Sequence, residues 1–263
     1  MFDTMFTEPV PARVFEMYRV VNARKTVKRS ELEELLVPDA LYPNKNKPNY
    51  INPTLNTAIE LGILSNVDNN ITALVDSKVL KSLDDLRNIA NQNLYKFRNG
   101  QFYQTTNAVM NMNEEVFHYN QIVELGKFVN NKTGIQINDT QIRGWRFWAE
   151  FLGFGNTQQT GTFLPNAYVF LHSILPYCNI EKKTTVTVTE FLNRINTYAG
   201  ILTENNKKTY LNLAFSSGLR QLHENKEIIL KHENDREINQ QLYPSESFFR
   251  ETVTDIEYLG VRK

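Results

Sequence analysis

The sequence lacks residues on which several classes of protein depend. Its 263 residues include one cysteine, Cys178, so an internal disulfide framework is excluded and a reducing compartment is expected. Lys plus Arg and Asp plus Glu each total 29, so the basic surplus typical of dedicated nucleic-acid binders is missing. A local basic stripe would still allow contacts with a DNA backbone.

Long apolar stretches are absent as well. No run approaches the ~20 apolar residues that a membrane-spanning helix needs. Residues 1–13 contain acidic residues and prolines where a signal peptide would have its apolar segment. Hydrophobic residues nevertheless make up 41% of the chain, which is enough for a buried core. We therefore expect a folded, soluble, cytoplasmic protein that does not associate with membranes.

The motifs of common catalytic and metal sites are also missing. The chain has neither the phosphate-binding loop GxxxxGK[ST] nor the nucleophile elbow GxSxG. Gly153 and Gly155 lack the third glycine of a dinucleotide-binding loop. No two histidines have the i, i+4 spacing of a zinc pair, and Cys178 has no second thiol nearby. The histidines are His118, His172, His223 and His232. We expect no enzymatic activity, no metal and no cofactor.

The clearest positive pattern spans residues 186–243. Val188, Phe191 and Ile195 fall on one face of a helix with Thr189 as its expected N-cap, and a second apolar stripe covers residues 210–222. The period then changes from about 3.6 to about 2, which predicts strands at 227–230 and 237–243. Helix, helix and hairpin is the order of a winged helix, a DNA-binding module. The pattern therefore indicates binding rather than catalysis.

Residues 9–80 follow the same order. Ser30, with Glu33 at the spacing of a capping box, is expected to begin the second of three helices. Pro53 is expected in the first turn of the third. The turn-rich residues 66–70 then lie between two short apolar segments, as in a hairpin. Three helices and a hairpin complete the winged-helix order.

Residues 119–180 repeat the order more loosely. They predict helices at 122–129 and at 139–152, the latter capped by Asp139 or Thr140, then a short hairpin and a further helix at 168–174. The predicted fold is therefore mainly α with short β-hairpins. Three tandem winged-helix modules are expected at residues 9–80, 119–180 and 181–244, with a helical connector at 81–118 and a C-terminal tail, 245–263, without an assigned role.

Short polar and basic side chains near the predicted recognition helices and wings are the candidates for DNA contact. Asn and Gln can pair with adenine edges and Arg with guanine, whereas Lys mostly contacts phosphate. The candidates are Lys45, Lys47, Asn52, Thr54 and Asn56 in the first module, Gln141, Arg143 and Arg146 in the second, and Lys207, Lys208, Asn212, Lys231 and Arg236 in the third. The alternative is that Asn and Thr cap helices and that Lys is ordinary surface. Glu233 and Asp235 would repel phosphate at the tip of the third wing.

The aromatic residues of 145–154 cover more than one helical face. Core packing is one explanation. The other is that Trp145, Trp148 and Phe154 form a surface on which a neighbouring protein docks. Formal neutrality and the small size of the expected modules favour protein docking at least as much as DNA reading.

Four segments carry a family resemblance. Phe15-Glu-Met-Tyr18, Leu32-Glu-Glu-Leu-Leu36-Val-Pro38, Thr57-Ala-Ile-Glu-Leu-Gly-Ile-Leu64 and Trp145-Arg-Phe-Trp-Ala-Glu-Phe-Leu-Gly-Phe-Gly155 resemble the G component of deazapurine-in-DNA (Dpd) gene clusters and related accessory proteins of phage-defence islands. The resemblance covers about the first two thirds of the chain. It implies a non-catalytic accessory protein that works beside helicase- and nuclease-type partners, and it supplies no functional residue.

The leading functional hypothesis is a non-enzymatic adaptor of a bacterial DNA-targeting defence complex, with weak binding to the backbone of double-stranded DNA and docking of protein partners. The alternative is a free-standing winged-helix transcription regulator that reads a specific operator. An enzyme whose site is not legible from the sequence is a third possibility.

Overall fold

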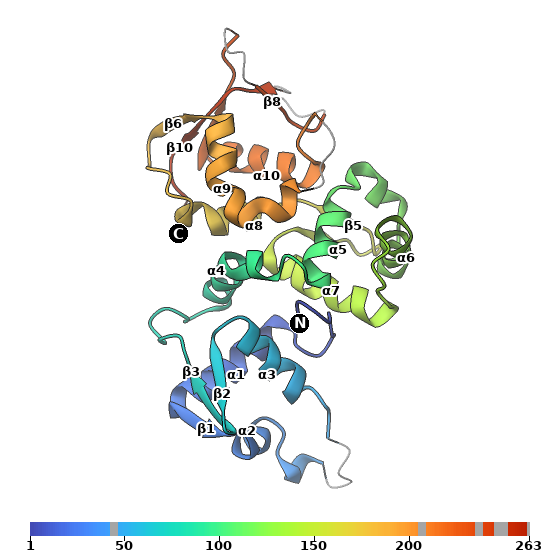
Figure 1. The fold of residues 1–263 in the computed structure, drawn as a ribbon, viewed down its shortest axis with the longest axis vertical. Coiled ribbons are helices and arrows are strands. Elements are labelled where there is room, and N and C mark those ends of the chain that lie inside the picture. Colours follow the sequence, from blue (N-terminus) through green and yellow to red (C-terminus); the bar gives the residue numbers. More distant parts are fainter. Residues whose placement is uncertain (43–46, 205–208, 235–238, 245–251, 262–263) are drawn as a thin grey trace.

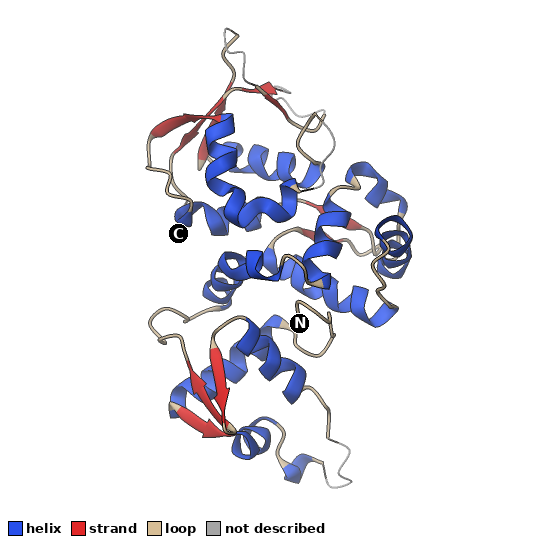
Figure 2. Cartoon of the chain, viewed as in Figure 1, coloured by secondary structure: helices blue, strands red, loops and turns tan. Residues whose placement is uncertain are grey.

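The computed structural model describes residues 1–42, 47–204, 209–234, 239–244 and 252–261. The fold is mainly helical with small antiparallel sheets, as the sequence predicts (Figures 1 and 2). Three groups of helices and strands follow one another along the long axis of the molecule. We call them the N-terminal unit (residues 11–73), the middle unit (101–165) and the C-terminal unit (168–258). None of the described helices combines the length and the apolar composition of a membrane span.

The N-terminal unit consists of three α-helices and a three-stranded antiparallel sheet of order β1-β3-β2. A two-residue turn, Asp68-Asn69, joins β2 to β3, and both residues have the positive φ of a type I′ hairpin turn (50° and 61°). The apolar sides of the helices and the sheet meet in the core, where Val27 pairs with Ile71. The elements are α1 (Pro11–Arg24), β1 (Thr26–Lys28), α2 (Arg29–Leu36), the 3₁₀ turn η1 (Asp39–Leu41), α3 (Ile51–Glu60), β2 (Leu64–Val67) and β3 (Asn70–Ala73).

The start of α2 differs from the prediction. The helix begins at Arg29 with Lys28 as N-cap and no side-chain cap, so the expected capping box of Ser30 and Glu33 is wrong. The backbone N–H of Arg29 donates to the carbonyl of Asn69 (2.9 Å), which satisfies one of the free amides that a cap would otherwise serve. This bond places the strand-to-helix junction directly beside the β2–β3 turn.

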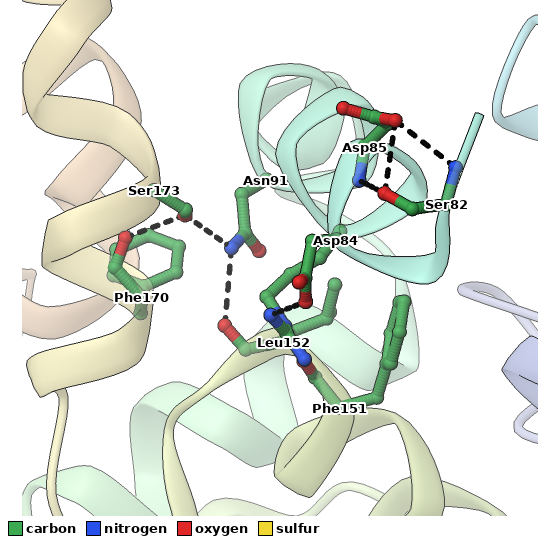
Figure 3. Close-up of polar contacts among 9 residues, drawn as sticks. Ser82, Asp84, Asp85, Asn91, Phe151, Leu152, Phe170 and Ser173 are labelled. Atoms are coloured by element: carbon green, nitrogen blue, oxygen red, sulfur yellow. Dashed lines mark hydrogen bonds and ion pairs between the residues drawn. The ribbon is translucent and has the colours of Figure 1, made fainter. Parts of the chain in front are cut away.

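Helix α4 (Leu83–Asn93), followed by the 3₁₀ turn η2 (Leu94–Phe97), joins the three units. A capping box of Ser82 and Asp85 begins it (Figure 3). The buried Asn91 donates to the carbonyl of Leu152 (3.0 Å) and to Oγ of Ser173 (2.6 Å), so one side chain ties α4 to both the middle and the C-terminal units. Residues 81–118 are largely helical, as the sequence predicts.

The middle unit has three α-helices and a two-stranded hairpin. Its elements are α5 (Gln101–Met110), the 3₁₀ helix η3 (Asn113–His118), α6 (Ile122–Thr133), α7 (Asp139–Leu152), β4 (Gly155–Thr157) and β5 (Phe163–Pro165). Asn138 caps α7, one residue before the expected Asp139, because Gln141 returns its side chain to the Asn138 amide and completes a capping box. Gly153, at φ 90°, ends the helix.

The C-terminal unit contains a three-stranded antiparallel sheet of order β6-β10-β7. Its elements are α8 (Tyr168–Ile174), the 3₁₀ turn η4 (Leu175–Tyr177), β6 (Thr184–Thr187), α9 (Val188–Thr203), α10 (Leu213–Glu224), β7 (Ile228–Lys231), β8 (Gln240–Gln241), β9 (Thr252–Val253) and β10 (Asp255–Tyr258). The strand at 237–243 that was expected to pair with residues 227–230 does not do so: β7 pairs with β10, and residues 240–241 pair with β9. The tail, which had no expected role, therefore supplies the central strand of the sheet.

The burial of apolar side chains explains why β10, rather than residues 240–241, pairs with β7. Ile256 and Tyr258 of β10 are buried, so this strand brings apolar side chains to the core that residues 240–241, two glutamines, do not have. Leu242 and Tyr243 turn inward instead, and the Tyr243 amide donates to Oγ of Ser216 on α10 (2.8 Å). At the other end of the sheet Thr187, rather than the expected Thr189, caps α9.

Candidate nucleic-acid interface

A winged helix contacts DNA through the free face of the helix that precedes its hairpin. The helix at the corresponding place in the chain order is α3 in the N-terminal unit, α7 in the middle unit and α10, which precedes β7, in the C-terminal unit. The three helices differ in how much of their polar surface remains open. Only predicted DNA-binding residues on the exposed part of each helix can reach a ligand.

Helix α3 presents an open face. Asn52, Asn56 and Ile59 are exposed at positions that follow one another along the helix, whereas the opposite side packs against α1. Thr54 belongs to that packed side and is 1% exposed, so its predicted contact with DNA is wrong. Asn52 and Asn56 lie where a ligand of α3 would meet them.

Arg29 connects this face to the start of α2 and to the hairpin turn. Its guanidinium donates to Oδ1 of Asn52 and, through Nε, to a carboxylate oxygen of Glu33 (3.2 Å). Beside it lies a shallow hollow lined by Lys28, Arg29, Ser30, Glu33 and residues 68–70. Lys28 and Arg29 were not among the predicted contacts. The signal was their position directly before α2.

The local charges are largely compensated. Lys47 pairs with Asp39 and with Glu34 (3.5 Å), and the hydrogen bond to Asp39 is the main cause that raises the pKa of its ammonium group. Glu33 and Asp68 likewise lie beside Lys28 and Arg29. Lys45 lies outside the described residues. The electrostatic attraction of this face for a phosphate backbone is therefore small.

Helix α7 is covered by residues 1–9 on the side that carries Gly144 and Trp148, and it exposes Asp139, Thr140, Arg143 and Phe147 elsewhere. Residues 1–9 run along it so closely that a Cβ on Gly144 would lie 2.2 Å from the carbonyl oxygen of Met5. Gln141 donates to the carbonyl of Thr4 (3.1 Å) and to Oε1 of Gln101 (3.0 Å), so this predicted DNA contact serves the fold instead. The guanidinium of Arg146 lies over the ring of Phe147 (5.0 Å), and Arg146 is only partly exposed.

Among the predicted contacts of α7 only Arg143 is well exposed. Gln141, Arg143 and Arg146 therefore do not form one open polar surface. The second set of predicted contacts is not brought together in the fold.

Helix α10 is buried more completely. Asn212 is 1% exposed, accepts a hydrogen bond from the Phe215 amide as N-cap (2.9 Å) and donates to the carbonyl of Leu202 (2.5 Å). The capping alternative is therefore correct for Asn212, and its predicted DNA contact is wrong.

The other predicted contacts of the third module lie outside α10. Lys231 pairs with Glu257 across the sheet (2.7 Å) and donates to Oγ1 of Thr185 (3.1 Å). Lys207, Lys208 and Arg236 lie outside the described residues.

The predicted docking aromatics are core residues. Trp145 is fully buried and donates to Oγ1 of Thr106 (2.9 Å), and Trp148, 1% exposed, donates to the carbonyl of Pro9 (2.7 Å). Phe154 is fully buried and stacks on Phe170 at 4.5 Å between ring centroids. None of the three is accessible to another protein, so this prediction is wrong. The N-terminal segment and α5 cover the apolar sides of α7 that carry Trp145 and Trp148.

Reactive groups elsewhere are sequestered. Burial raises the pKa of the Cys178 thiol to about 12, so the thiol stays protonated at neutral pH. Glu227 is 2% exposed and accepts a hydrogen bond from the hydroxyl of Tyr168 (3.0 Å). Over the described part of the chain, no group of three His, Cys, Asp or Glu side chains has the arrangement of a metal site.

A family model described as DpdG-like matches residues 5–115 of the chain. The match spans the N-terminal unit, α4 and α5, and so contains the open face of α3. Three of the four motifs that carried the resemblance lie within it, whereas residues 145–155 do not. Neither the curated proteins nor the solved structures contain a match to the chain. Over residues 5–115, the resemblance to the G component of Dpd clusters is thus confirmed.

Proposed function

We propose that the protein is a non-enzymatic accessory subunit of a bacterial anti-phage DNA-targeting defence system, which binds duplex DNA weakly and docks protein partners. The observation that carries the proposal is the open face of α3 within the segment that matches the DpdG-like family. Similarity to the DpdG-like family suggests a protein encoded in a Dpd-associated defence cluster. The proposed partners are helicase- or nuclease-type subunits, and the proposed role needs no cofactor.

The order of elements supports the binding module. The N-terminal unit runs helix, strand, helix, helix, strand, strand, and its sheet order is first, third, second strand. The C-terminal unit runs α8, β6, α9, α10, β7, β10, with the small β8–β9 pair inserted between β7 and β10, and has the equivalent sheet order. The middle unit has three helices and a hairpin. We interpret these units as two winged helices and one winged-helix-like module, of which the first has an open recognition helix.

The charges favour weak binding. Lys47 and Lys231 are engaged in ion pairs within the chain, and the cations beside α3 have acidic neighbours. The described cations beside α3 would displace only a few counterions from DNA, so the affinity should decrease only gently as salt increases. This property suits a subunit whose partners supply most of the affinity of the complex.

A free-standing transcription regulator is the second candidate, because an open recognition helix fits operator reading as well. A regulator of this type is expected to be a symmetric dimer on a pseudo-palindrome, whereas an adaptor can be monomeric in isolation. The mass of the purified protein in solution, with and without DNA, separates these two expectations.

The direct test is fluorescence anisotropy with the full chain on random duplexes and on duplexes from upstream regions of its own genome, at low and at physiological salt. The proposal predicts weak binding to all duplexes, which declines gently with salt and, because it is weak from the start, falls below detection at physiological salt. Tight binding to one upstream sequence that survives physiological salt would instead establish the regulator. Absence of binding at every salt concentration would remove the DNA contact from the proposal and leave protein docking.

A further inference from the structure

The open face of α3 has a distinctive chemistry. Its exposed side chains are two amides one helical turn apart, Asn52 and Asn56, followed by the aliphatic Ile59, which is 37% exposed. Glu60, the one charged residue of α3, accepts a hydrogen bond from the backbone N–H of Phe2 (3.2 Å), which directs its carboxylate toward residues 1–2. A ligand of the open face therefore meets amide and aliphatic groups.

The two asparagines are not equivalent. Oδ1 of Asn52 accepts a hydrogen bond from Arg29, so its amide is engaged within the chain. An asparagine needs both its oxygen and its nitrogen to pair with adenine through N6 and N7. Asn56, exposed one turn further along, is the better placed of the two for this contact.

Ile59 also favours A·T base pairs. It follows Asn56 by three residues and so lies on the same side of the helix. An aliphatic side chain at that place fits the methyl group of thymine. Guanine would favour Arg or Lys, and cytosine Asp or Glu, and the open face of α3 offers none of these.

We infer that α3 reads A·T base pairs in the major groove through Asn56 and Ile59, while Lys28 contacts an adjacent phosphate. The occupant is duplex DNA, because the amide and aliphatic groups of α3 suit base edges and the cation of Lys28 suits a phosphate. The Arg29–Asn52 hydrogen bond joins this face of α3 to the hollow that Lys28 lines. The inference rests on the DNA contact of the proposed function and adds to it the site and the base preference.

The test measures anisotropy of the full chain on two duplexes of equal length, one with a core of A·T pairs and one with a core of G·C pairs. We expect tighter binding to the A·T core by about 5- to 150-fold, the discrimination that one bidentate contact provides. Asn56→Ala should remove most of this preference, and Ile59→Ala should weaken binding to the A·T core more than to the G·C core.

Two further variants complete the design. Lys28→Gln should lower the affinity for both duplexes equally and reduce the salt slope by about one. Asn193→Ala, which removes an exposed asparagine of α9, is the matched control and should bind like the unchanged protein. Because Asn56 is exposed, its variant should unfold at the temperature of the unchanged protein, which excludes misfolding as the cause of a loss.

The outcomes separate the two levels of the proposal. If the unchanged protein binds neither duplex, the proposed DNA contact fails and the inference fails with it. If it binds both duplexes but without preference, or if Asn56→Ala keeps the preference, the base-reading role of α3 is overturned while DNA binding stands.

Discussion

The indole N–H of Trp148 donates a hydrogen bond to the carbonyl of Pro9 at 2.7 Å, across 139 residues of sequence. This bond attaches the N-terminal segment to α7, the helix that precedes the hairpin of the middle unit. Phe2 reinforces the attachment, with its ring edge-on to Trp148 at 5.4 Å. The segment therefore makes the Trp148 side of α7 part of the core.

Trp148→Phe should lower the free energy of unfolding by about 2–4 kcal/mol, because it leaves the Pro9 carbonyl without its donor and opens a small cavity. Chemical denaturation measures this change. Phe147→Leu, at the exposed neighbouring position, is the control and should cost less than about 1 kcal/mol. Equal effects of the two variants would contradict the burial of Trp148.

Asn91→Ala should also destabilise the protein, by about 1–3 kcal/mol, because it leaves the Leu152 carbonyl unpaired inside the core (Figure 3). A double-mutant cycle with Ser173→Ala should show coupling, since the two side chains share a hydrogen bond of 2.6 Å. Additive effects would mean that the bond contributes nothing. Asn93→Ala, two residues further along α4 and half-buried, should have the smaller effect.

The C-terminal sheet depends on a strand from the tail. Ile256→Ala should cost about 2–5 kcal/mol, since the side chain is fully buried in the middle of the sheet. Glu257→Ala, on the adjacent position with its ion pair to Lys231, should cost about 1 kcal/mol or less. A tail without a role in the fold would tolerate both changes equally.

Alkaline pH should destabilise the protein in part through Cys178. Burial raises the pKa of this thiol from 9.0 to about 12, so its contribution to stability is complete below pH 9 and is lost as the pH approaches 12. The unfolded chain ionises first, and the free energy of unfolding should fall by up to about 1.4 kcal/mol per pH unit from this group. Unfolding curves between pH 8.5 and 10.5 should be less steep in pH for Cys178→Ala than for the unchanged protein. Identical slopes would show that the thiol is accessible.

Sequence reasoning succeeded where the determining interactions are local. Helical spacing and turn residues predicted most of the helices, and the turn-rich residues 66–70 predicted the β2–β3 hairpin. It failed where distant segments meet. The partner of β7 is β10, more than twenty residues along the chain, and no periodicity within 227–243 could reveal it. The capping residues were displaced by one or two positions because neighbouring side chains and carbonyls compete for the same amides.

The candidate site shows the same division. Asn52 and Asn56 were predicted as contacts and are exposed, because helical spacing distinguishes the two faces of α3. Asn212 and Trp148 were assigned to surfaces and are buried, since their burial depends on Leu202 and Pro9, which the sequence does not place beside them. Periodicity reports which face of a helix is apolar. It does not report whether a distant segment covers the other face.

The most direct test of the central claim is hydrogen exchange of the full chain, measured by mass spectrometry with and without a saturating duplex at low salt. Binding through the N-terminal unit predicts slower exchange in peptides that cover α3 and the start of α2, without change in α7 and α10. Slower exchange confined to α10 or α7, with α3 unchanged, would contradict the assignment of DNA binding to the N-terminal unit.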